Sequence, residues 1–236
     1  MSPTTPAYTP DNPLRIMPFG DSNTWGTGNP DSTGDPATTV GYRLVLRDAL
    51  QSAGVASCFV GSFRVGYSAF EDCRTEGWPG KGINTLIWRV REGLLERHTP
   101  DVILLLIGAN NMWRSLQDRR PIGPLATLYW VWRLQRLLGE MRHRGPKTRI
   151  LVGKPVTPGN ARLPLALYRA GIVVLTAVYR AFGARMWAVD LRAENDGVHY
   201  TPTGHAQVAT LWCAAICRLV APQNVTSAGA SSPIPT

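Results

Sequence analysis

Short apolar runs alternate along the chain with longer segments of helical periodicity. The runs are bounded by glycine, proline or polar residues, which is typical of buried strands. The predicted strands are residues 14–19, 55–60, 101–107, 149–152 and 185–189, and the predicted helices are residues 40–53, 83–98, 125–143, 163–182 and 203–219. This alternation predicts an α/β fold, a three-layer α/β/α sandwich with a five-stranded parallel sheet.

The same pattern sets the expected domain boundaries. Residues 1–13 are rich in proline and threonine and are interpreted as an N-terminal lead-in. Residues 14–221 form one predicted domain, because 236 residues suit one large domain better than two small ones. Residues 222–236 are rich in serine, alanine and proline, and we expect a disordered tail there. Residues 62–82 are rich in glycine, serine and aromatic residues and are predicted to form a long functional loop.

Polar residues with catalytic potential follow three of the predicted strands. Ser22 follows the first strand, Asn110 the third, and the Asp196–His199 pair the last. In sheets of this kind, ligands bind outside the carboxyl ends of the strands, so these residues are expected at one edge. A histidine that takes the serine proton and a carboxylate that orients the histidine are the parts of nucleophilic acyl transfer. Each residue alone has a more ordinary explanation as a turn, cap or packing residue, so the argument depends on their coincidence.

Charge and cysteine content narrow the class of protein. The formal net charge is +9 and the sequence pI about 9.9, but the basic residues are spread along the chain and no nucleic-acid-binding signature accompanies them. We therefore expect no nucleic-acid partner and no cofactor or metal. The longest strongly apolar stretch, 170–178, is too short to span a bilayer. The start of the sequence has no secretory signal, which favours a cytoplasmic protein, or a secreted one if the start was trimmed.

The four cysteines are too few and too widely spaced to predict a disulfide framework. Cys213 and Cys217 lie four residues apart on a predicted helix and are expected to be free thiols. A Cys58–Cys73 bridge stays open for a protein that meets an oxidising compartment. The segment 77–82 lacks the spacing of a phosphate-binding P-loop, and no G-x-S-x-G surrounds Ser22.

Four ordered blocks of the sequence resemble the blocks of the GDSL, or SGNH, hydrolase family. They are Gly20-Asp21-Ser22, Glu76-Gly77-Trp78-Pro79-Gly80, Gly108-Ala109-Asn110-Asn111 and Asp196-Gly197-Val198-His199. The resemblance runs from about Arg15 to Leu219 and is nearest to the acetylxylan-esterase-like members, with similar stretches at 40–43, 59–62 and 100–102. It implies the flavodoxin-like SGNH fold and a serine esterase or lipase that acts on carboxylic esters without a cofactor.

The resemblance also implies a role for each matching residue. Ser22 is the expected nucleophile, His199 the general base and Asp196 its partner. The backbone N–H groups of Ser22 and Gly80 and the side-chain amide of Asn110 are the expected oxyanion donors. Asp196 is preferred to Asp190 as the partner because it lies only three positions before His199, so a single local turn can bring the two side chains together. His205 is interpreted as a packing or helix-start residue. Asn111 stands where the family usually has aspartate, and an amide can keep the hydrogen bonds of a structural aspartate.

The substrate is less defined by the sequence than the chemistry. The pocket is expected between residues 62–82, 112–124 and 157–162, and the expected wall residues are Trp25, Trp78, Met112 and Trp113. Three hypotheses stay open: hydrolysis of a small O-acyl group on a carbohydrate or small metabolite, an acyltransferase or thioesterase-like enzyme with the same triad, and a non-catalytic binding protein. The expected partner is thus an ester substrate, and the sequence does not predict an oligomeric state.

Overall fold

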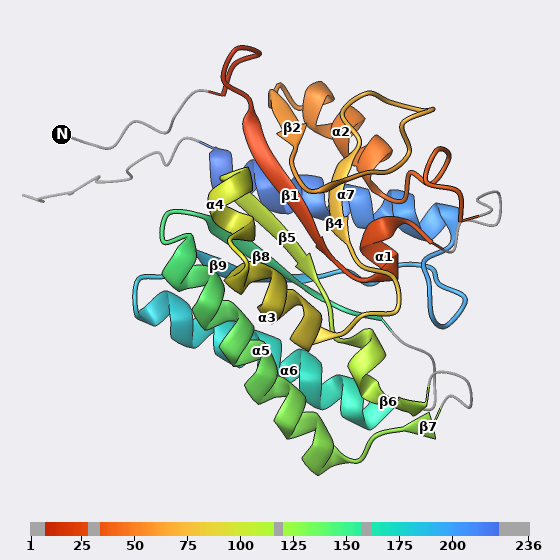
Figure 1. Cartoon of the computed structure of the whole chain (residues 1–236), viewed down its shortest axis with the longest axis vertical. Coiled ribbons are helices and arrows are strands. Elements are labelled where there is room, and N and C mark those ends of the chain that lie inside the picture. The colour runs from red at the N-terminus through yellow and green to blue at the C-terminus, as the bar shows by residue number, and fades with distance from the viewer. Residues whose placement is uncertain (1–7, 28–33, 116–119, 157–161, 222–236) are drawn as a thin grey trace, which may run out of the picture.

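A computed structural model describes residues 8–27, 34–115, 120–156 and 162–221 of the chain (Figure 1). Its central sheet has the strand order β3-β4-β1-β5-β8-β9, and β2 also pairs with β1. All of these pairs are parallel except that of β3 with β4. The strands are β1 (Leu14–Gly20), β2 (Ser57–Phe59), β3 (Phe63–Arg64), β4 (Arg74–Gly77), β5 (Val102–Leu106), β8 (Arg149–Lys154) and β9 (Met186–Asp190).

Helices cover both faces of this sheet (Figure 1). Alternate strand residues belong to the two cores that result. In β5, Ile103 and Leu105 belong to one core, and Val102 and Leu104 belong to the other. The first core is covered by α3 (Ile83–Arg91), α4 (Leu94–His98), α5 (Pro124–Arg144) and α6 (Arg162–Ala181), and the second by α2 (Arg43–Ser52) and α7 (Pro202–Val220). The predicted three-layer α/β/α fold is confirmed.

Three short elements lie at the carboxyl ends of the strands. The helix α1 (Ser22–Trp25) follows β1, and the 3₁₀ helix η1 (Ala109–Met112) follows β5. A two-stranded hairpin of β6 (Trp113–Ser115) and β7 (Arg120–Pro121) comes directly after η1. These elements place several of the residues predicted for catalysis at one edge of the sheet.

The structure corrects two details of the predicted elements. The predicted loop 62–82 contains β3 and β4, and β4 joins the central sheet through the pairs Phe19–Glu76 and Gly20–Gly77. The sheet therefore has more strands than the five predicted. The helix predicted over 83–98 is divided into α3 and α4 by Gly93, whose φ of 83° is left-handed.

Two further expectations concern the cysteines and membrane spans. All four cysteines are free thiols, so Cys58 and Cys73 are not bridged. Among the described residues, one helix is long enough and apolar enough to cross a membrane by length and composition alone, and that helix is α6. Its buried residues include Tyr168 and Ile172, which belong to a core of the sandwich, so this property is weak evidence for a span. The lead-in through residue 7 and the tail from residue 222 lie outside the described residues.

Candidate active site

Ser22 is the first residue of α1 and follows the buried end of β1. A Cβ atom on Gly20 would lie 2.1 Å from the carbonyl oxygen of Leu106, so the tight approach of β1 and β5 requires glycine there. Asp21 caps α1, since its carboxylate accepts a hydrogen bond from the backbone N–H of Asn23 at 3.1 Å. Burial of Asp21 raises its pKa to about 7. Ser22 itself keeps 7% of its surface exposed at the strand edge.

His199 reaches Ser22 from the loop between β9 and α7. The Nε2 atom of His199 lies 3.1 Å from Oγ of Ser22. The Asp196 carboxylate accepts hydrogen bonds from the backbone N–H groups of Val198 and His199, both at 2.8 Å, and the Asp196 N–H donates to the His199 carbonyl at 3.0 Å. These bonds close a tight turn that includes both Asp196 and His199.

The charge state of His199 suits a base. Burial lowers the pKa of His199, and the negative charge of Asp196 opposes that shift. The imidazole is therefore neutral near pH 7 and can accept a proton. Asp190, the alternative partner, is engaged elsewhere, because its carboxylate lies 2.9 Å from Nζ of Lys154 and 3.2 Å from Nε of Arg192.

Asn23 holds the His199 loop against α1, and the sequence analysis did not assign it a role. Its side-chain nitrogen donates to the carbonyl of Val198 at 3.1 Å, and its side-chain oxygen accepts from the N–H of Tyr200 at 3.0 Å. One amide thus bonds to the residues on both sides of His199. The signal in the sequence was its place directly after Ser22.

We expect Asn23→Ala to lower kcat for p-nitrophenyl acetate by roughly 10- to 100-fold with little change in KM, because misplacing a catalytic group by about 1 Å costs up to this much. Asn23→Asp keeps an acceptor for Tyr200 but has no donor for Val198, so its loss should be smaller. Steady-state kinetics of the two variants measure this order. A wild-type kcat in Asn23→Ala would show that the amide does not position His199.

The expected oxyanion donors lie on three different elements. Ser22 is the first residue of a helix, and Gly80 lies in the turn after β4; among the described residues neither backbone N–H has a hydrogen-bond acceptor. The amide nitrogen of Asn110 donates to the carbonyl of Lys81 at 2.9 Å, which ties η1 to the residue after Gly80. An amide nitrogen carries two protons, so one stays available.

The backbone conformation at position 80 favours glycine. The φ of Gly80 is 71°, a left-handed value that residues with a side chain rarely adopt. The backbone turn itself therefore selects this residue.

Asn111 supports the start of α3. Its side-chain oxygen accepts the backbone N–H of Ile83 at 3.1 Å, and a Cβ on Gly82 would lie 2.6 Å from its side-chain nitrogen. The amide thus makes a bond that an aspartate could also accept at this position.

The predicted wall residues have different environments. Trp25 and Trp78 are half-buried and both pack edge-on against Phe63, at centroid distances of 5.5 and 4.8 Å. Trp113 is half-buried in β6. Met112 is completely buried in the core, so the prediction that it lines the pocket is wrong. The segments 116–119 and 157–161 of the predicted pocket lie outside the described residues.

His205 is a packing residue, as the sequence analysis proposed. It lies in the first turn of α7, is 3% exposed, and its ring centroid is 5.7 Å from that of Tyr200. Burial lowers its pKa to about 4, so it is neutral at physiological pH. In the part of the chain that the structure describes, no group of three or more His, Cys, Asp or Glu could hold a metal ion.

Fold and site together are those of an ester hydrolase. The sequence profile of the GDSL-like lipase/acylhydrolase family matches residues 19–207, which is most of the chain. The chain belongs to this family.

Solved structures with the same fold include carbohydrate esterases. A Clostridium thermocellum family 3 carbohydrate esterase is 27% identical, with a TM-score of 0.70, over 88% of this chain and 98% of that chain. A Talaromyces cellulolyticus carbohydrate esterase of family 3 is 17% identical, with a TM-score of 0.68 and the same coverage. The acetyl xylan esterase AlAXEase is 17% identical, with a TM-score of 0.62, over 86% of this chain and 100% of that chain. Comparison with curated proteins gives no match.

Proposed function

We propose that this protein is a serine esterase that removes a small acyl group, such as acetyl, from a carbohydrate or small metabolite. The observation that carries the proposal is the 3.1 Å distance between Nε2 of His199 and Oγ of Ser22. The likeness to the Clostridium thermocellum carbohydrate esterase supports a sugar-bound ester as the substrate.

The proposed reaction has two halves. His199 takes the Ser22 proton while Oγ attacks the ester carbonyl, and the negative charge of Asp196 stabilises the imidazolium. The backbone N–H groups of Ser22 and Gly80 and the Asn110 amide donate to the oxyanion, and each donor is worth roughly 3 kcal/mol in the transition state. His199 then gives its proton to the leaving alcohol, which departs and leaves Ser22 acylated.

Water completes the cycle. His199 takes a proton from a water molecule that attacks the acyl carbonyl, and returns it to Oγ of Ser22 as the carboxylic acid leaves. An acyltransferase would use the same groups with an alcohol in place of this water, so the acceptor has to be tested directly.

Release of acetate from acetylated xylo-oligosaccharides, without and with an added alcohol, distinguishes these reactions. The proposal predicts one free acetate per ester cleaved and no dependence on the alcohol. Cleavage that occurs only when the alcohol is present, and that yields an ester of this alcohol in place of free acetate, would contradict the proposal and assign an acyltransferase instead.

A further inference from the structure

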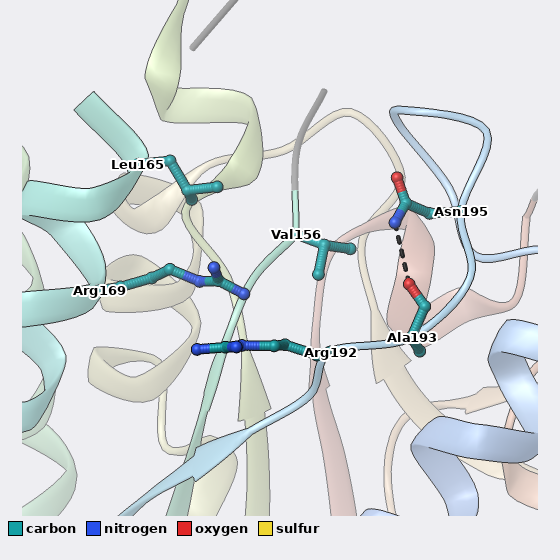
Figure 2. A pocket seen from close by; sticks show the side chains of 6 residues that line it. All are labelled: Val156, Leu165, Arg169, Arg192, Ala193 and Asn195. Atoms are coloured by element: carbon teal, nitrogen blue, oxygen red, sulfur yellow. Dashed lines mark hydrogen bonds between the residues drawn. The ribbon is translucent and has the colours of Figure 1, made fainter. Parts of the chain in front are cut away.

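A cavity of about 260 Å³ opens at the carboxyl ends of β8 and β9 (Figure 2). Its wall combines apolar and cationic side chains. The lining residues are Val156, Leu165, Arg169, Arg192, Ala193 and Asn195. The volume lies slightly below the range typical of drug-sized ligands, so the cavity suits one chemical group of a larger molecule.

Two guanidinium groups reach this cavity from different elements. Arg169 comes from α6 and Arg192 from the segment after β9, as Figure 2 shows. Both lie near Asp190, whose carboxylate is 3.9 Å from Nη2 of Arg169 and 3.2 Å from Nε of Arg192. Lys154 also pairs with Asp190 at 2.9 Å. Three cations thus surround one carboxylate, which leaves an excess of two positive charges.

Among the residues that the structure describes, no other acidic group lines the cavity to offset this excess. The side chain of Glu194 accepts the hydroxyl of Thr201 at 2.9 Å, and Asp196 accepts the backbone N–H groups of its own turn. Neither residue lines the cavity. Burial raises the pKa of Asp190, but Lys154, Arg192 and Arg169 outweigh that effect and the net shift is downward, as a carboxylate among surplus cations requires.

Only part of the Arg169 side chain is open to the cavity. Its Nε and Nη2 atoms are inaccessible to solvent, and Nη2 lies 3.9 Å from the Asp190 carboxylate. The side chain as a whole keeps 24% of its surface exposed and lines the cavity. An oxyanion in the cavity would be attracted by the charge of Arg169 and would meet its exposed part, and hydrogen bonds to a charged donor are the stronger ones.

The cavity lies beside the site described above. Asn195 precedes Asp196 directly and pairs with Tyr200, the residue after His199. In the sheet, β8 is two strands from β1 and β9 is three. At about 4.8 Å per strand, the cavity lies roughly 10 to 14 Å from the end of β1 that carries Ser22. A sugar-sized group, together with the long arginine side chains that would meet it, can extend across the distance between Ser22 and the cavity.

We propose that this cavity binds an oxyanion, a carboxylate or a phosphate, carried by the alcohol part of the ester, so that the enzyme prefers acidic esters. The inference rests on the proposed esterase function. The apolar side chains of Val156 and Leu165 would contact the carbon skeleton, and Arg169 and Arg192 would bind the anion.

Matched substrates test this preference and distinguish the two anions. They are mono-O-acetyl methyl glucoside, the corresponding glucuronoside and the corresponding glucoside 6-phosphate. We expect kcat/KM for one or both anionic esters to exceed that of the neutral ester by about tenfold or more in wild type, because charge-assisted hydrogen bonds are the stronger ones. Arg169→Gln and Arg192→Gln should each bring this ratio close to one.

Arg180→Gln is the matched control, since it removes the same charge from the last turn of α6, eleven residues and roughly 16 Å along the helix from Arg169. It should keep the wild-type ratio. The side chain of Arg192 is 79% exposed, so its replacement should also leave folding unchanged.

Three outcomes would overturn the proposal: no preference for either anionic ester, a preference that survives both cavity variants, or an equal loss in Arg180→Gln, which would indicate the general positive field. Binding of methyl glucuronoside and methyl glucoside 6-phosphate, measured by calorimetry, separates this inference from the proposed function. Binding that Arg192→Gln abolishes, without hydrolysis of any ester, would keep the anion site and reject the esterase. Hydrolysis without a preference would do the reverse.

Discussion

Replacing Ser22 with alanine is expected to lower kcat/KM for p-nitrophenyl acetate by about four orders of magnitude or more. The change removes the only atom that forms the acyl-enzyme in the proposed reaction, while the oxyanion donors and His199 stay in place. The free energy of unfolding should change little, because the one side-chain hydrogen bond of Ser22 among the described residues is with His199. Steady-state kinetics and thermal unfolding of the same preparation measure both effects.

Ser62 provides a matched control. Its Oγ lies 3.2 Å from Nε2 of His98, nearly the same distance as in the Ser22–His199 pair. Ser62 follows β2 rather than β1 and belongs to none of the four blocks that resemble the family. Ser62→Ala should therefore retain wild-type activity. If activity survives in Ser22→Ala but is lost in Ser62→Ala, the nucleophile is Ser62 and its base is His98, which would contradict the proposal.

Replacing Arg43 with methionine is expected to reduce the free energy of unfolding by about 3–5 kcal/mol. Arg43 is fully buried, and its guanidinium donates to four backbone carbonyls: those of Val65 and Cys73 at 2.7 Å, and those of Trp25 and Thr39 at 3.1 Å. Burial lowers its pKa to about 10, so it remains a cation at neutral pH. Methionine fills similar volume but removes a donor from each of these carbonyls, and only that of Cys73 keeps another described donor, the N–H of Val65 at 3.1 Å.

Urea unfolding measures this loss as a lower midpoint at an unchanged slope. Arg47→Met is the control, because Arg47 lies one turn further along α2 and pairs with Asp48 at the surface. Its loss should be below about 1 kcal/mol. Similar losses in the two variants would mean that the four carbonyl contacts of Arg43 contribute nothing specific to stability.

The hydrophobic pattern was sufficient for the main strands and helices, because a strand such as β5, which is buried on both faces, has few alternatives. It was not sufficient for β4. The sequence of β4, Arg74-Thr75-Glu76-Gly77, is polar, and Glu76 is completely buried only because its carboxylate accepts the N–H of Ser62 and the ring N–H of Trp78. Such tertiary hydrogen bonds leave no periodic signal in the sequence.

Some residues of the candidate site could also be predicted from the sequence, and others depend on tertiary packing. Ser22 and His199 could be predicted to meet, because both follow strands whose carboxyl ends share one edge. Met112 was misread because proximity to a catalytic block in sequence says nothing about which way a side chain points; it points into the core. Arg169 could not be selected from the sequence, since it is one of many arginines and only packing of α6 brings it to the cavity.

The most direct test of the central claim is covalent labelling of the intact protein with a fluorophosphonate, followed by peptide mass spectrometry. The account predicts one label per chain, on Ser22, with loss of p-nitrophenyl acetate hydrolysis in proportion to labelling. Protein that hydrolyses the ester but carries no label on Ser22, or carries it on another residue, would contradict the account.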